Sequence, residues 1–155
     1  MTDIMARWGS LLVFVVLVVA AAWTGSTFKP GIWYEGLSKP DFTPPNWLFP
    51  VAWTILYAMI AVAGWRVWRA GGGLSAAVVI WGVGLALNAL WSYVMFGAHD
   101  IGWALVNIYA LLAAVFVFIV KAWQIDRTAA LMFVPYALWV SFASLLNFAI
   151  WQLNP

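Results

Sequence analysis

Residues 101–120 read IGWALVNIYALLAAVFVFIV, an apolar stretch that contains no Asp, Glu, Lys, Arg or His. A helix needs about 20 residues to cross the hydrocarbon core of a bilayer, and this stretch has that length. Because lipid offers the backbone no hydrogen-bond partner, a spanning segment is either a helix or a strand of a closed barrel. Barrel strands alternate apolar and polar residues, and no alternation is present here. The stretch therefore predicts a transmembrane helix.

Four further stretches have the same uncharged, apolar character. With the first, they cover residues 8–24, 46–65, 74–96, 101–120 and 128–151. The composition agrees, because 66% of the residues are hydrophobic and 8% are charged, whereas soluble domains are roughly half apolar and a quarter charged. We predict an all-α integral membrane bundle of five transmembrane helices that forms a single domain over residues 1–155.

The connections between these stretches differ greatly in length. Residues 97–100 are a short link, which predicts an antiparallel pair of helices. The longest connection, residues 25–45, reads GSTFKPGIWYEGLSKPDFTPP. Its prolines and aromatic side chains are not typical of a flexible linker. We therefore expect this loop to fold back and cap one end of the bundle.

The cations are distributed unevenly between the two sides that five spans create. One side would hold Arg7, Arg66, Arg69, Lys121 and Arg127, and the other Lys29 and Lys39. The positive-inside rule then places the amino terminus inside and the aromatic loop outside. Cations scattered in this way do not form a groove for phosphates, so we expect no nucleic-acid partner.

The first span also fits an alternative interpretation. Arg7 precedes an apolar run that ends in Ala20, Ala21 and Ala22, a pattern typical of a signal-peptidase site. On this interpretation the first span would be removed from the mature protein.

Several kinds of chemistry have no residues to support them. The spans contain no charged side chain, which argues against an ion-coupled transporter. They also offer no paired acid and base and no activated nucleophile, so hydrolysis and group transfer are poor candidates. The chain has no cysteine, which excludes thiolate catalysis and sulfur metal sites. His99, beside Asp100 in a short link, is either a solvated turn residue or an axial metal ligand.

The chain contains 13 tryptophans. Those near the span ends fit an interfacial belt that anchors helices at the membrane surface. Others lie deeper and share helix faces with polar or small residues at spacings of three and four. These stripes are Trp53 and Tyr57; Trp81, Gly84, Asn88, Trp91 and Met95; and Trp139, Ala143 and Asn147.

Three amides lie at membrane depth: Asn88, Asn107 and Asn147. An unpaired polar group there costs several kcal/mol, so these side chains are expected to point inward. They either join helices by hydrogen bonds or line a pocket in which indole faces stack on a flat apolar ligand. Ala110 and Ala114 are spaced for close helix packing or for a dimer seam.

A set of motifs spread over nearly the whole chain resembles the tryptophan-rich sensory protein and translocator protein family, also known as peripheral-type benzodiazepine receptors. The motifs are Lys29-Pro30, Trp33-Tyr34, Lys39-Pro40, Thr43-Pro44-Pro45, Phe49-Pro50, Trp53, Leu56-Tyr57, Leu87-Asn88, Trp91, residues 134–139 (VPYALW) and Leu146-Asn147. They occur in the family's order.

The resemblance implies a five-helix bundle, commonly a homodimer, that retains its first span. It implies a cavity for protoporphyrin IX, haem-type tetrapyrroles or other flat apolar molecules, including benzodiazepine-type ligands, with no obligatory cofactor and no metal. The ligand-binding residues carried over are Tyr34, Trp53, Asn88, Trp91, Trp139, Ala143 and Asn147.

The resemblance leaves three functions open. The first is a receptor or sensor with a regulatory role in tetrapyrrole homeostasis or stress response. The second is light-dependent porphyrin degradation, in which Trp53 and Trp139 would be the catalytic indoles. The third is passive translocation of porphyrin or sterol. Residues 146–152 (LNFAIWQ) lack the tyrosine and basic residue of the animal cholesterol motif. A bacterial-type sensor is therefore expected rather than a sterol-specific protein.

Overall fold

The computed structural model describes residues 2–155, with side chains from residue 8 onward, and these residues form helices and loops without a strand. The helices are α1 (Thr2–Thr27), α2 (Ile32–Glu35), α3 (Leu48–Ala70), α4 (Ala76–Ser92), its π-helical continuation η1 (Tyr93–Gly97), α5 (Ile101–Trp123) and α6 (Arg127–Leu153). Within the described residues, five helical segments are long and apolar enough to cross a membrane. This confirms the predicted all-α bundle.

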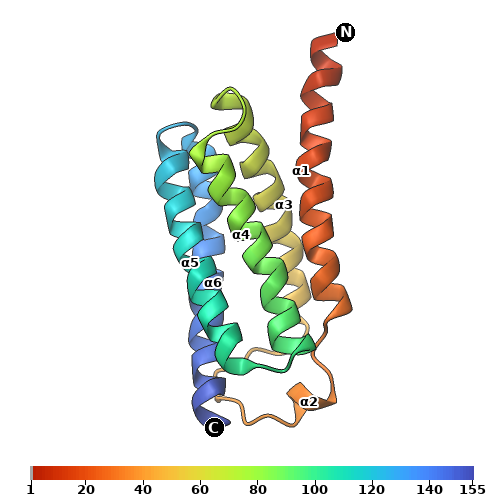
Figure 1. Cartoon of the computed structure of the whole chain (residues 1–155), viewed down its shortest axis with the longest axis vertical. Coiled ribbons are helices and arrows are strands. Elements are labelled where there is room, and N and C mark those ends of the chain that lie inside the picture. Colours follow the sequence, from red (N-terminus) through yellow and green to blue (C-terminus); the bar gives the residue numbers. More distant parts are fainter. Residues whose placement is uncertain (1) are drawn as a thin grey trace.

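The long helices lie side by side in one bundle (Figure 1). Helix α1 packs against α3 and α4, α5 packs against α4 and α6, and α3 packs against α6. The connections α3–α4 and α5–α6 lie at the end where α1 begins, whereas α2, η1 and the carboxyl terminus lie at the other end (Figure 1). We call this second end the loop end, because residues 28–47 cross it.

Several helices continue past the ends that the uncharged stretches predicted. Helix α3 runs to Ala70 instead of ending near residue 65, and α5 runs to Trp123. In α3, the charged residues beyond the apolar stretch have partners near the membrane surface. The Arg69 guanidinium, for example, lies 5.1 Å from the centroid of the Trp65 ring.

Three helices begin at a side chain that caps their first turn. Ser75 accepts a hydrogen bond from the Val78 N–H at 3.4 Å, and Asp100 accepts one from the Trp103 N–H at 2.9 Å. Such caps satisfy amide groups that have no partner inside the helix. They explain how links as short as residues 98–100 reverse the chain.

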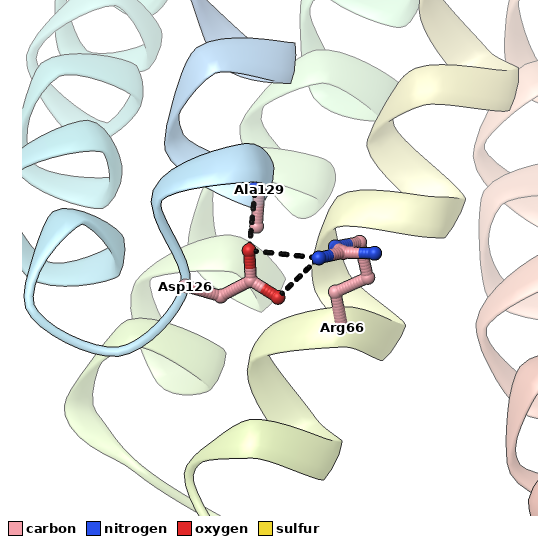
Figure 2. A network of polar contacts seen from close by, with 3 residues as sticks. All are labelled: Arg66, Asp126 and Ala129. Atoms are coloured by element: carbon pink, nitrogen blue, oxygen red, sulfur yellow. Dashed lines mark hydrogen bonds and ion pairs between the residues drawn. The ribbon is translucent and has the colours of Figure 1, made fainter.

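The third cap, Asp126, also joins α6 to α3 (Figure 2). Its carboxylate accepts a hydrogen bond from the Ala129 N–H at 3.0 Å. The Arg66 Nη2 donates to Oδ1 at 3.1 Å and lies 2.9 Å from Oδ2. Burial opposes ionisation of this carboxyl, but the Ala129 N–H and the Arg66 guanidinium outweigh it and hold the pKa of Asp126 below its ordinary value.

Helices α1, α3 and α4 meet around a buried indole in the half of the bundle away from the loop end. The Trp81 indole N–H donates to the Ile60 carbonyl at 2.9 Å, and the Phe14 ring packs edge-on against Trp81 at 4.9 Å between centroids. A Cβ placed on Gly64 would lie 2.5 Å from Trp81 Cε2. Only glycine at residue 64 allows the helices to approach this closely.

Helix α4 ends in the π-helical turn η1, where the Ala98 N–H bonds to the Tyr93 carbonyl at 2.8 Å. The turn buries Met95, which is 1% exposed, and is followed by His99, whose φ is +57°. Such turns hold one residue more than an α-helical turn. They therefore change which side chains face the bundle.

Residues 28–47 are held against the loop end at several points. Trp33 stacks on His99 with ring centroids 4.3 Å apart and 14° between planes. At the carboxyl terminus, the Asn154 side chain accepts from the Ser38 N–H and donates to the Ser38 carbonyl, each at 3.0 Å. The loop is therefore an ordered part of the bundle.

Candidate ligand-binding site

Aromatic rings from α3 and α6 form a packed group that we call the aromatic cluster. Its members are Phe49, Trp53, Tyr57, Tyr136 and Trp139. The Trp53 and Trp139 rings lie 6.4 Å apart at 88°, and the Trp53 and Tyr136 rings 6.2 Å apart at 72°. These are the edge-to-face arrangements that aromatic side chains favour. The two mid-depth indoles therefore meet edge to face across the α3–α6 contact.

Asn88 of α4 links the cluster's two hydroxyl groups. The Tyr57 hydroxyl donates to Asn88 Oδ1 at 2.9 Å, and Asn88 Nδ2 lies 3.3 Å from the Tyr136 hydroxyl oxygen, to which it donates. Asn88 is 4% exposed. This amide thus joins three helices, as the interhelical hydrogen-bonding interpretation expected.

A second polar group lies closer to the loop end. The Trp91 indole N–H donates to Asn147 Oδ1 at 3.0 Å, and Asn147 Nδ2 donates to the Ile101 carbonyl at 3.2 Å. The Phe96 ring packs edge-on against Trp91 at 5.5 Å and against Tyr34 of the loop at 5.4 Å. A continuous line of rings therefore runs from the loop into the bundle.

The residues predicted for the site fall into these groups. Trp53 and Trp139 belong to the aromatic cluster, and Asn88 is bonded to it. Trp91 and Asn147 form the second polar group, which Tyr34 reaches only through Phe96. Ala143 is half-buried on α6, one turn from both Trp139 and Asn147.

Among the described residues, two buried polar atoms of uncharged side chains have no hydrogen-bond partner. They are the Trp139 indole nitrogen and Asn107 Oδ1. All three amides that were expected to point inward are buried. A buried donor without a partner costs about 1–3 kcal/mol of folding free energy. An acceptor that bonded to the Trp139 N–H would remove this cost.

The space beside the cluster is small. A hollow lined by Ile60, Trp81, Gly84, Tyr136 and neighbours leaves about 10 Å³ for the centre of a water molecule, which is room for about one water. The rings of the cluster touch one another where the sequence predicted a shared cavity. A tetrapyrrole can enter here only if these rings or the loop move.

Metal chemistry has little support in the part of the chain that the structure describes. The side chains that the structure describes, those of residues 8–155, include no group of three or more His, Cys, Asp or Glu that could hold a metal. His99 is exposed and stacks on Trp33. The arrangement is instead suited to stacking and to hydrogen bonding with neutral donors.

Some residues of the site were not assigned from the sequence. Tyr57 and Phe49 lie four residues on either side of Trp53, and Tyr136 lies three before Trp139. Spacing had already put Tyr57 on a stripe with Trp53, and the same spacing could have placed Phe49 and Tyr136 in the cluster. Phe96 had no such signal, because the π-helical turn sets its direction.

Comparison with known proteins places the chain in a family. The TspO/MBR family matches residues 13–152. Protein CrtK of Rhodobacter capsulatus is 42% identical over 152 residues, covering 94% of this chain and 95% of that protein. The tryptophan-rich sensory protein of Cereibacter sphaeroides is 37% identical (95% and 92% covered), and the human translocator protein is 34% identical (95% and 91% covered). With its bundle of membrane-length helices and its indole-rich interior, the chain belongs to the TspO/MBR family of multi-pass integral membrane proteins.

Proposed function

We propose that this protein is a membrane receptor or sensor for flat, apolar ligands of the tetrapyrrole class, with a regulatory role in tetrapyrrole homeostasis or stress response. Benzodiazepine-type molecules fit the same description. The rings of the aromatic cluster separate on binding, and the ligand then lies between α3 and α6, stacked on the indoles of Trp53 and Trp139. The names of the relatives, a sensory protein and a translocator protein, are consistent with this role.

The observation that carries the proposal is the unpaired indole N–H of Trp139. It is buried among rings that offer a flat ligand large apolar faces, and it lacks an acceptor. An oxygen atom at the rim of the ligand supplies that acceptor. Binding then removes a desolvation cost that the empty protein carries.

Titration with protoporphyrin, followed by quenching of tryptophan fluorescence in lipid nanodiscs, tests this function. Wild-type protein is expected to show saturable quenching. Trp139→Phe keeps a ring but removes the N–H, and is expected to weaken binding roughly fivefold to tenfold, the equivalent of one hydrogen bond. Trp103→Phe changes an exposed indole and serves as the control. Equal affinities of Trp139→Phe and wild type would show that the N–H does not contact the ligand.

The contact between the two indoles also favours a second candidate, light-dependent porphyrin degradation. An excited porphyrin takes one electron from the Trp53 or Trp139 indole, and the porphyrin radical anion passes that electron to dioxygen, which becomes superoxide. The indole radical cation regains its electron from the ground-state porphyrin, and the resulting porphyrin radical cation combines with superoxide. The net reaction is oxidation of the porphyrin by dioxygen, with the indole restored. Illumination with and without oxygen, comparing Trp53→Phe and Trp139→Phe with wild type, tests it. If the variants bleach bound porphyrin as fast as wild type, the indoles have no chemical role.

A further inference from the structure

Lys39 is a half-buried cation with no acidic partner. Its Nζ donates to the Glu35 carbonyl at 3.1 Å and to the Leu37 carbonyl at 3.2 Å, and lies 4.8 Å from the Tyr34 ring centroid. Among the described residues, the ion pair within 4.0 Å is Arg66–Asp126, which lies at the other end of the bundle. Within the described part of the chain, the ammonium group therefore has direct contacts with carbonyl dipoles and a ring face.

Its position connects this charge to the candidate site. Lys39 lies over Tyr34, the Tyr34 ring packs on Phe96, and Phe96 packs on Trp91. The other lysine of the loop, Lys29, is exposed. Lys39 is thus the loop cation that contacts the line of rings leading into the bundle.

The neighbouring hydroxyl does not compete for this charge. Burial raises the pKa of Tyr34, so its side chain remains a neutral phenol at physiological pH. An incoming carboxylate would meet an ammonium group that already has one N–H directed at neither backbone carbonyl.

We propose that Lys39 recognises a carboxylate of the ligand, so that the site distinguishes acidic tetrapyrroles from neutral flat molecules. This inference rests on the proposed function. The apolar body of the ligand lies among the rings, and its acidic side chain remains at the loop end, where Lys39 pairs with it. Charge-assisted hydrogen bonds of this kind are stronger than neutral ones and depend on geometry.

Two ligands with the same macrocycle, one acidic and one neutral, provide the test. Binding of protoporphyrin IX, a dicarboxylic acid, is compared with binding of its neutral dimethyl ester in nanodiscs of zwitterionic lipid. The proteins are wild type, Lys39→Gln, Lys39→Arg and the control Lys29→Gln. Lys39→Gln is expected to weaken binding of the diacid roughly tenfold and leave the ester unchanged. Lys39→Arg is expected to retain most of the affinity for the diacid. Lys29→Gln is expected to leave the affinity for both ligands unchanged.

The possible failures are distinguishable. If Lys39→Gln weakens the binding of both ligands equally, Lys39 positions the loop and does not bind a carboxylate. If Lys39→Gln changes the affinity for neither ligand, or if wild type binds the ester as tightly as the diacid, the inference is wrong while the receptor function stands. If wild type binds neither compound saturably, the receptor function fails, and carboxylate recognition fails with it.

Discussion

Replacing Asp126 separates two contributions that one carboxylate makes to stability. Asp126→Asn keeps an oxygen that caps the Ala129 N–H but removes the charge that pairs with Arg66. The Arg66 side chain is 36% exposed and that of Asp126 13%. Solvent screening limits such a pair to about 1 kcal/mol, which is the loss expected for Asp126→Asn. Asp126→Ala also removes the cap, which adds about 1 kcal/mol, so a total of about 2 kcal/mol is expected.

The measurement is equilibrium unfolding of detergent-solubilised protein, monitored by circular dichroism at several pH values. Because the pKa of Asp126 is lowered in the folded chain, its contribution is fully present above the ordinary carboxyl pKa. It is lost as the pH falls through the lower folded value. Wild type should therefore lose stability relative to Asp126→Asn as the solution is acidified into that range.

Two results would refute this reasoning. If Asp126→Asn and Asp126→Ala are equally stable, the hydrogen bond to Ala129 contributes nothing to α6. If the difference between wild type and Asp126→Asn does not change on acidification, the Arg66 pair is not the source of the lost stability. Arg66→Gln should reproduce the effect of Asp126→Asn, and the double variant should cost less than the sum of both.

Two further perturbations test the packing and the loop. Gly64→Ala forces a Cβ against Trp81 and should destabilise the protein by about 1–3 kcal/mol in the same unfolding assay. The control is Gly82→Ala, whose new Cβ has nothing within 4 Å. This control should stabilise the protein by up to about 1 kcal/mol, because alanine has the higher helix propensity. Asn154→Ala removes both hydrogen bonds to Ser38 and should speed amide hydrogen exchange in residues 33–40 roughly tenfold. Unchanged exchange there would show that the carboxyl terminus does not restrain the loop.

The bundle itself could be predicted because uncharged stretches of membrane length have few structural alternatives in lipid. The helix ends could not, because they depend on partners that are remote in sequence. Arg66 interrupts an apolar stretch, yet α3 continues through it because Asp126 is close in space. The short helix α2 had no sequence signal beyond the rigidity expected of its loop.

The candidate site was predictable as helix faces but not as contacts. Spacing placed Trp81, Asn88 and Trp91 on one stripe of α4, and all three are buried or half-buried. The structure separates them, because Trp81 bonds to Ile60 whereas Asn88 and Trp91 meet α6 through Tyr136 and Asn147. Periodicity fixes the face of a helix, and only the packing of neighbouring helices decides which residues meet on it.

The π-helical turn makes the segment that follows α4 tolerant of a change in length. Because the turn holds one residue more than an α-helical turn, deleting one residue from Tyr93–Gly97 would allow ordinary winding to resume while the residues beyond it keep their direction. The stack of His99 on Trp33 would then persist. A family member with one residue fewer at this place would therefore be able to attach its loop to the bundle through the same contact.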